Sequence, residues 1–141
     1  MTIVLFACVH NAGRSQIAAA FFNALADPGK AKALSAGTKP AEKIHPEVVE
    51  VMREVGIDLS RMKPQKFTDE LARKGQMLIT MSCGESCPLV PGLFRDDWQI
   101  SDPKGQTLDA VRLIRDEISR RVQALIQRKG WERPRRVRSA Y

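Results

Sequence analysis

The fold is decided close to the start of the chain, by the stretch Ile3-Val4-Leu5-Phe6-Ala7-Cys8-Val9-His10-Asn11-Ala12-Gly13-Arg14-Ser15. Its apolar first part predicts a buried strand over Thr2–Ala7. The run that follows, Gln16-Ile17-Ala18-Ala19-Ala20-Phe21-Phe22, predicts a helix from about Gly13 to Ala26. A cysteine therefore closes a strand, and an arginine and a serine follow it where the helix begins.

A loop of this kind can bind an anion, because its backbone N–H groups and those of the first helical turn carry partial positive charge. The planar guanidinium of Arg14 can bind two oxygens of that anion. The same positive field favours the thiolate form of Cys8, which makes this side chain a nucleophile. The expected oxyanion-binding residues are Val9, His10, Asn11, Ala12, Gly13, Arg14 and Ser15.

A structural interpretation of the same residues is the alternative. A cysteine after a strand is often a small buried hydrophobe, and Arg14 alone would often form a surface salt bridge. The spacing of Cys8 and Arg14 between a strand and a helix favours the catalytic interpretation, because this is the structural context that the motif requires.

The composition is that of an ordinary globular protein, with 43% apolar and 28% charged residues in a chain of 141. That length predicts a single domain, which we place at residues 1–128, followed by a basic tail at 129–141. The net charge is +7, but residues 128–138 hold six basic residues and one acidic residue, which leaves about +2 elsewhere. We therefore expect no nucleic-acid-binding surface on the domain.

The sequence also predicts a cytoplasmic protein that binds no membrane. No apolar run approaches the ~20 residues that span a bilayer. Met1 leads directly into the first predicted strand, without a basic and apolar leader. Three cysteines are an odd number, which does not favour a disulfide framework. In a reducing compartment, such cysteines are more often catalytic or metal-binding.

Strands and helices are predicted to alternate along the chain. The expected strands are Thr2–Ala7, Ala31–Ala36, Gln76–Met81 and Asp97–Ile100, and further helices are expected to begin near Pro46, Thr68 and Thr107. The last helix carries an apolar stripe of Val111, Ile114, Ile118, Val122 and Leu125. Such alternation implies right-handed crossovers and a sheet covered on both faces. We predict an α/β fold, a three-layer sandwich around a central four-stranded parallel sheet.

Three chemically active groups follow strands in this scheme. Cys8 follows the first strand, Cys83 the third and Asp102 the fourth. Ligands of such folds bind beyond the carboxyl ends of the strands, so these groups are expected at one edge of the sheet. Pro103 biases Asp102 toward an extended backbone, from which its carboxyl can donate a proton to a leaving oxygen. The alternative is an ordinary Asp-Pro turn.

The segment Cys83-Gly84-Glu85-Ser86-Cys87-Pro88 adds two more cysteines at the same edge. Protein thiols can deliver two electrons by disulfide exchange, which predicts a redox role for this segment. A zinc site formed with Cys8 and His10 is the alternative, but C-x-H and C-x3-C are not the usual zinc spacings. Arg14 beside Cys8 would also repel a cation, so we expect no metal.

The stretch from Cys8 to Ser15 resembles the active-site loop of the low-molecular-weight protein tyrosine phosphatases and, more closely, that of their relatives the thiol-dependent arsenate reductases. The resemblance implies that Cys8 is the nucleophile, that Arg14 binds the oxyanion, that Asn11 braces the loop and that Ser15 hydrogen-bonds the thiolate. A second match is Ser35-Ala36-Gly37-Thr38. The similarity runs from Thr2 to about Arg128 and implies a low-molecular-weight phosphatase-like fold.

The run Thr80-Met81-x-Cys83-Gly84-x-x-Cys87-Pro88 is similar to that of the thioredoxin-coupled arsenate reductases. This similarity implies that Cys8, Cys83 and Cys87 form a relay that reduces arsenate to arsenite, with Asp102 as general acid. It implies no bound cofactor. The electrons would come from thioredoxin, or alternatively from glutaredoxin or a mycothiol system, and phosphate and sulfate would compete with arsenate.

A low-molecular-weight protein tyrosine phosphatase-type phosphomonoesterase is the alternative function. Such an enzyme needs a single cysteine, because water hydrolyses its cysteinyl-phosphate. The phosphatases carry a pair of tyrosines after their Asp-Pro, whereas Lys104-Gly105-Gln106 follows Asp102-Pro103 here. Some members of the superfamily also bind potassium through a glutamate in the first helix. The matching residue is Ala19, so that site is not expected.

Overall fold

The computed structural model describes residues 1–82 and 90–134, so Cys83 and Cys87 lie outside the described residues. The strands are β1 (Thr2–Cys8), β2 (Ala31–Gly37), β3 (Met77–Met81) and β4 (Phe94–Trp98), and the helices are α1 (Arg14–Leu25), α2 (Pro46–Arg53), α3 (Asp69–Lys74) and α4 (Leu108–Lys129). The strands form one sheet in the order β2-β1-β3-β4, and each neighbouring pair is parallel.

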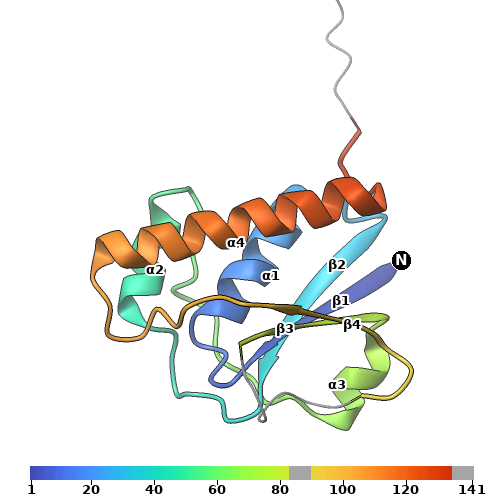
Figure 1. Ribbon diagram of the computed structural model, residues 1–141, viewed down its shortest axis with the longest axis horizontal. Coiled ribbons are helices and arrows are strands. Elements are labelled where there is room, and N and C mark those ends of the chain that lie inside the picture. The colour runs from blue at the N-terminus through green and yellow to red at the C-terminus, as the bar shows by residue number, and fades with distance from the viewer. Residues whose placement is uncertain (83–89, 135–141) are drawn as a thin grey trace, which may run out of the picture.

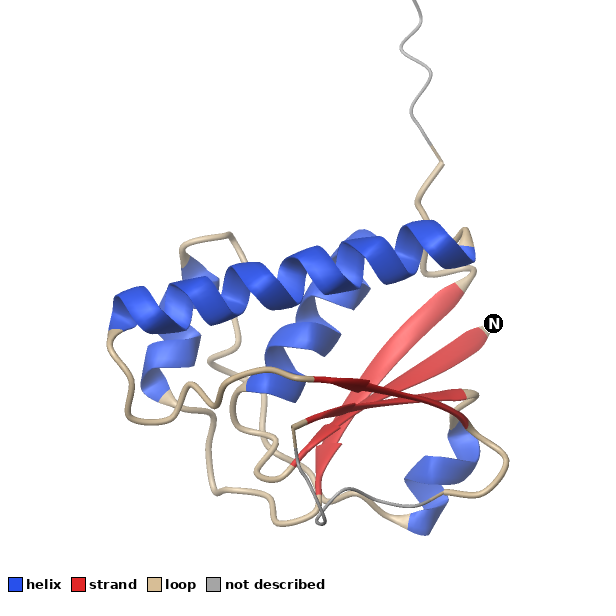
Figure 2. Ribbon diagram, viewed as in Figure 1, coloured by secondary structure: helices blue, strands red, loops and turns tan. Residues whose placement is uncertain are grey.

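Helices cover both faces of this sheet. Helices α1, α2 and α4 lie on one face, and the short helix α3 lies on the other (Figure 1). Colouring by secondary structure shows the sheet as the middle of three layers (Figure 2). The predicted three-layer sandwich around a four-stranded parallel sheet is therefore confirmed.

Strand β1 lies inside the sheet and is apolar on both faces. Val4 and Phe6 belong to the main core, which β1 shares with α1, α2 and α4. Leu5 and Ala7 belong to a smaller cluster that includes Leu71 of α3. Each of the four strand residues is at most 1% exposed. Burial on both faces explains why this strand is a continuous apolar run rather than an alternating one.

Side-chain and glycine caps fix the helix ends close to the predicted positions. The Thr68 hydroxyl accepts a hydrogen bond from Leu71 N at the start of α3, and the Thr107 hydroxyl accepts one from Ala110 N at the start of α4. Gly130 ends α4 in the left-handed conformation, with φ 72°. The predicted stripe of α4 is buried along its whole length.

The prediction for the fourth strand was shifted along the chain. Strand β4 is Phe94–Trp98 rather than Asp97–Ile100, and its register pairs Met81 with Trp98. This strand is at the edge of the sheet and mostly exposed, and Phe94 is 60% exposed. An exposed edge strand has no apolar pattern to mark it, which explains the error. Ile100 lies beyond the strand and is buried.

The chain just after α4 packs back onto the domain. The Trp131 ring contacts Phe22 edge-on, with 5.8 Å between the ring centroids, and Glu132 forms an antiparallel β-bridge with Ala26.

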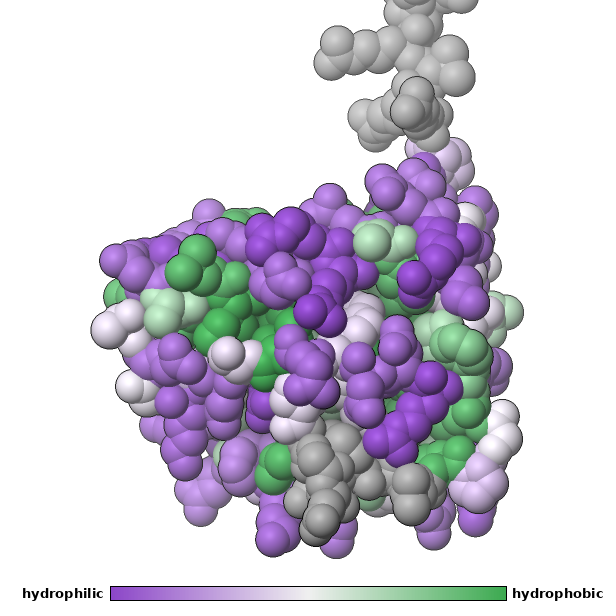
Figure 3. Space-filling view, in the orientation of Figure 1, coloured by the Kyte–Doolittle hydropathy of each residue, from purple (hydrophilic) through white to green (hydrophobic). Residues whose placement is uncertain are grey.

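Hydrophilic side chains dominate the face of the molecule seen in Figure 3, and apolar ones gather below the amino-terminal half of α4. Within residues 1–82 and 90–134, no helix is both long and apolar enough to cross a membrane.

Candidate active site

The loop between β1 and α1 forms the site, and Gly37 of β2 allows its path. Cys8 ends β1 and is 2% exposed, and its partner in the parallel register is Gly37. A Cβ atom on Gly37 would lie 2.5 Å from the Val9 carbonyl oxygen and 2.9 Å from Asn11 N. A side chain at this position would therefore push the loop away from the sheet. The glycine of the Ser35-Ala36-Gly37-Thr38 segment is thus part of the loop's support.

Asn11 holds the loop from the inside. Its backbone is left-handed, with φ 51°, a conformation that asparagine tolerates better than most residues. Its Oδ1 accepts hydrogen bonds from Gln65 N at 2.9 Å and from Gln16 Nε2 at 3.0 Å. Because a backbone N–H can only donate, the Gln65 contact fixes the orientation of the Asn11 amide. Its Nδ2 must then face Ser15, to which it donates at 2.7 Å.

Ser15 connects this amide to the cysteine. Its Oγ lies 2.8 Å from Cys8 Sγ, and both residues are buried. Since the Ser15 oxygen already accepts from Asn11, its own proton is free to point at the sulfur. A hydrogen bond donated to sulfur favours the thiolate over the thiol. The chain Gln65–Asn11–Ser15–Cys8 therefore supports a nucleophilic cysteine.

Arg14 begins α1 and is the buried cation of the site. It is 7% exposed, and its Nη1 donates to the Ile100 carbonyl at 3.3 Å. Its Nη2 lies 3.8 Å from Asp102 Oδ2. Its Nε is buried and has no hydrogen-bond partner within the described chain. A buried charged donor without a partner is costly, so an acceptor from outside the protein would complete this group.

Asp102 lies beside the loop because the next residue, Pro103, packs against the loop at Gly13. A Cβ atom on Gly13 would lie 2.7 Å from Pro103 Cγ, so the missing side chain of Gly13 lets the two segments touch. The Asp102 side chain is 46% exposed, and its Oδ1 accepts from Lys104 N at 3.0 Å. The structure thus brings Cys8, Arg14 and Asp102 to the same edge of the sheet.

The loop turns its carbonyl groups away from this centre. Four carbonyl oxygens of the loop accept hydrogen bonds from backbone N–H groups. The donors and acceptors are Lys39 N and Val9 O, Ala41 N and His10 O, His45 N and Ala12 O, and Ile17 N and Gly13 O. Each of these donors belongs to a neighbouring segment or to the helix. The four oxygens therefore do not point at the place where an anion would bind. Their partial negative charge would repel an anion there.

Two histidines lie at the rim of the site. His10 Nδ1 is 3.1 Å from the Lys39 carbonyl. His45 precedes α2, and burial lowers its pKa, while nearby Asp102 partly opposes that shift. No group of three His, Cys, Asp or Glu side chains in residues 1–82 and 90–134 could hold a metal ion. Ala19 is buried on α1 and offers no ligand.

Three residues that support the site were missed in the sequence. Gln16 and Gln65 hold the Asn11 amide, and Gln65 is 54 residues away from it along the chain. Ser82 follows β3 with a left-handed backbone, at φ 57°, and precedes Cys83. The Ser82 Oγ accepts a hydrogen bond from Ile100 N at 2.8 Å. This contact fixes Ile100, whose carbonyl accepts the hydrogen bond from Arg14. A left-handed serine has no signature in the sequence that could have revealed it.

Comparison with known proteins gives related sequences and structures. A glutaredoxin arsenate reductase of Synechocystis is 34% identical over 130 residues, which are 89% of this chain and 97% of the relative. The solved structure of an arsenate reductase from Archaeoglobus fulgidus shares 33% identity at a TM-score of 0.77, over 88% of this chain and 98% of that one.

A thioredoxin-dependent arsenate reductase of Corynebacterium glutamicum has a similar solved structure, with 38% identity and a TM-score of 0.78. The match covers 92% of this chain but spans 62% of the length of that one. The model of the low molecular weight phosphotyrosine protein phosphatase family matches residues 3–134. The chain therefore belongs to the low molecular weight phosphotyrosine protein phosphatase family, and it is similar to the arsenate reductases within it.

Proposed function

We propose that this protein is an arsenate reductase, which converts arsenate to arsenite with Cys8 as nucleophile and a three-cysteine relay. One observation carries the oxyanion part of the proposal. The buried Arg14 has an Nε without a partner in the described chain, next to a cysteine whose sulfur is hydrogen-bonded by Ser15. A tetrahedral oxyanion seated over Cys8 would accept from this Nε and from the backbone N–H groups of the loop.

The first chemical step joins sulfur to arsenic. The Cys8 thiolate attacks the arsenic of arsenate, and one oxygen leaves as water after receiving a proton. Asp102 is the proton donor in this proposal, because its carboxyl lies beside Arg14, which would hold the oxyanion, and is open to solvent, from which it takes the proton that it delivers. Arg14 and the loop hold the remaining oxygens.

The next steps move the electrons. Cys83 attacks the sulfur of Cys8, the sulfur–arsenic bond breaks, and its electron pair stays on arsenic, which leaves as arsenite. The resulting Cys8–Cys83 disulfide is attacked by Cys87, which frees Cys8 and leaves a Cys83–Cys87 disulfide. Two thiols are oxidised for each arsenic reduced, so the electrons balance. No bound cofactor is required.

Hydrolysis of a phosphomonoester is the second candidate. The family match and the grouping of Cys8, Arg14 and Asp102 favour it, since these groups suffice for attack on phosphorus and protonation of the leaving oxygen. Two features favour the reductase instead. The chain carries Cys83 and Cys87, which a phosphatase does not need, and Lys104-Gly105-Gln106 rather than tyrosines directly follow Asp102-Pro103.

The electron donor in our proposal is thioredoxin, with glutaredoxin and a mycothiol system as alternatives. One similar protein is named thioredoxin-dependent and another is named a glutaredoxin arsenate reductase. Any of these donors requires a compartment that keeps thiols reduced, so we place the protein in the cytoplasm. Phosphate and sulfate would compete with arsenate for the loop, because they share its tetrahedral oxyanion shape.

The test is NADPH oxidation that depends on arsenate, measured with thioredoxin and its reductase, and in parallel with glutaredoxin and glutathione. We expect turnover with at least one of these donors and little hydrolysis of an aryl phosphate. Efficient hydrolysis of the aryl phosphate without reduction of arsenate would establish the phosphatase instead.

Two arginine variants make that assay specific. Arg14→Lys should lower arsenate turnover by about 100-fold or more, because an ammonium cannot replace the planar fork. Arg115→Lys is the matched control. Arg115 is also buried, but its guanidinium is hydrogen-bonded to Val51, Glu54 and Asp116. The control should keep nearly normal turnover at a temperature where both variants are folded, and equal losses would refute the role of Arg14.

A further inference from the structure

A cavity of about 550 Å³ lies on the side of α1 that faces β2 and the loop over residues 56–65. This volume is in the range of small-molecule sites, about 300–1,000 Å³. Cys8, Arg14 and Asp102 do not line it, so it is separate from the candidate active site. Its lining is mainly apolar, with a few polar groups, which is the usual character of a ligand pocket.

Small side chains on α1 create the space. Ala20 and Ala24 form one wall, and Leu34, Ile57 and Met62 form the others. Residues 56–65 line the cavity opposite Ala20 and Ala24, and larger side chains at the two alanine positions would fill it. Met62 is 52% exposed there, so apolar surface faces water. An apolar body in the cavity would remove that surface from water, which is favourable.

The charges that line the cavity are positive in balance. Lys32 and Lys63 line it, and within the described residues neither forms an ion pair. Asp58 is the carboxylate among the lining residues, and hydrogen bonds from Ser60 hold its pKa below the usual value. Asp58 also interacts with Arg53 and Arg61, so it does not neutralise the two lysines.

We propose that this cavity binds a small organic monoanion with an apolar body, with its carboxylate between Lys32 and Lys63. The apolar walls take the body of the ligand, and the two ammonium groups take its charge. Binding in this cavity does not require the reaction at Cys8.

The cavity is connected to the catalytic loop through two glutamines. Gln16 and Gln65 both line the cavity and both donate to Asn11 Oδ1. Gln16 Nε2 also lies 3.4 Å from the Lys63 carbonyl. A ligand that orders Lys63 is therefore expected to affect Gln16, whose amide is hydrogen-bonded to Asn11. Binding should therefore change the amide NMR signal of Asn11, although the ligand does not contact this residue.

The experiment is a titration of the reduced protein with octanoate, followed by amide NMR. We expect saturable shifts in residues that line the cavity and in Asn11, with little change in α3 on the opposite face. Octanol, which has the same chain length without the charge, should bind at least about tenfold more weakly. Equal binding of the two probes, or no saturable shift, would overturn the proposal.

Variants locate the site independently of any assay of turnover. The double variant Lys32→Glu and Lys63→Glu should weaken octanoate binding at least about tenfold, because two charges are reversed. Lys74→Glu on α3 is the control and should not change the affinity. Ala24→Phe at the wall should block the probe while the amide spectrum stays that of a folded protein. Unchanged affinity in the double variant or in Ala24→Phe would contradict the proposal.

Discussion

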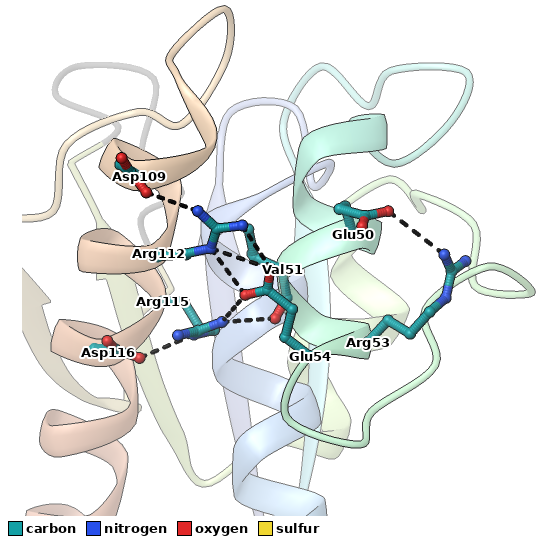
Figure 4. Close-up of polar contacts among 8 residues, drawn as sticks. All are labelled: Glu50, Val51, Arg53, Glu54, Asp109, Arg112, Arg115 and Asp116. Carbon is teal, nitrogen blue, oxygen red and sulfur yellow. Dashed lines mark hydrogen bonds and ion pairs between the residues drawn. The ribbon is translucent and has the colours of Figure 1, made fainter.

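Two polar networks in this molecule differ in where they lie and in what they leave unpaired. The first surrounds Cys8 at the end of β1, where Cys8, Asn11 and Ser15 are at most 2% exposed. The second, which we call the surface network, joins the end of α2 to α4, with only Arg115 buried, and consists of Glu54, Asp109, Arg112, Arg115 and Asp116 (Figure 4). The first is made of mostly neutral hydrogen bonds, and the second of charges.

The surface network pairs its charges completely. Glu54 accepts from Arg112 and Arg115 at 2.7–3.0 Å, and those hydrogen bonds lower its pKa to about 2. Beside the buried network, Arg14 Nε has no partner in the described chain. We therefore expect the charged network to serve stability and the surroundings of Cys8 and Arg14 to bind a ligand at some expense of stability.

The largest effect should follow from changing the nucleophile itself. Cys8→Ser should lower arsenate turnover by at least about 100-fold, because a serine hydroxyl has no comparable anionic form in this loop. The fold should persist, since the substitution changes one buried atom. Turnover and the thermal unfolding midpoint are the measurements. More than about a hundredth of the wild-type rate would show that Cys8 is not the nucleophile.

Breaking the buried network one step away should reduce both stability and reactivity. Asn11→Ala leaves Gln65 N without its acceptor and removes the donor to Ser15, which should cost about 1–3 kcal/mol of unfolding free energy. The rate of Cys8 alkylation by iodoacetamide should fall with it, because Ser15 is no longer oriented.

Asn23→Ala is the matched control for that variant. Asn23 lies on α1, outside the loop, and its amide is bonded to the backbone of Ala33 through both of its polar atoms. Its loss should lower stability without slowing alkylation of Cys8. If both variants slowed alkylation equally, the effect would come from general loosening and not from the Asn11–Ser15 contact.

The surface network should respond to pH in a defined window. The folded-state pKa of Glu54, about 2, is below its ordinary value of 4.5, so its stabilising effect is present above about pH 4.5. It is lost as the pH falls toward 2. Glu54→Gln should therefore lower the urea unfolding midpoint at neutral pH, and the difference should shrink through this window.

Glu50→Gln is the control for Glu54→Gln. Glu50 pairs with Arg53 at 3.5 Å, with both side chains more than half exposed, and such pairs contribute little (Figure 4). A midpoint difference for Glu54→Gln that is the same at neutral pH and at pH 2, or no larger than that of Glu50→Gln, would contradict this view of the network.

The smallest effect should come from the tail. Removing residues 133–141 should leave turnover almost unchanged, because terminal charges beyond α4 are screened by salt. Extending the deletion to residue 131 should lower the thermal midpoint, because Trp131 packs on Phe22. A large loss of turnover in the shorter deletion at physiological salt would show that the tail takes part in the site.

The sequence predicts the parts of this structure that local pattern controls. The apolar run of β1 and the capping residues Thr68 and Thr107 mark elements that the structure confirms. Strand β4 was misplaced because an exposed edge strand has no apolar period. The contacts of Gln65 with Asn11 and of Ser82 with Ile100 could not be predicted, because they join segments far apart in the chain.

The candidate site also has features that the local sequence predicts and features that depend on distant segments. The spacing of Cys8 and Arg14 indicates an oxyanion loop, since strand, loop and helix are contiguous. What the sequence could not reveal is that Arg14 is buried with an Nε that has no partner in the described chain, because that depends on how Ile100 and Asp102, which follow β4, pack against Arg14.

The most direct test of the central claim is a single turnover of the fully reduced protein with arsenate and no redox partner. The proposal predicts one arsenite released per protein chain, with two thiols lost for each arsenite, and no release from Cys83→Ser. Cys87→Ser should release arsenite once and retain a Cys8–Cys83 disulfide that peptide mapping detects. Absence of arsenite, with all thiols still free and an aryl phosphate hydrolysed by the same sample, would contradict the reductase.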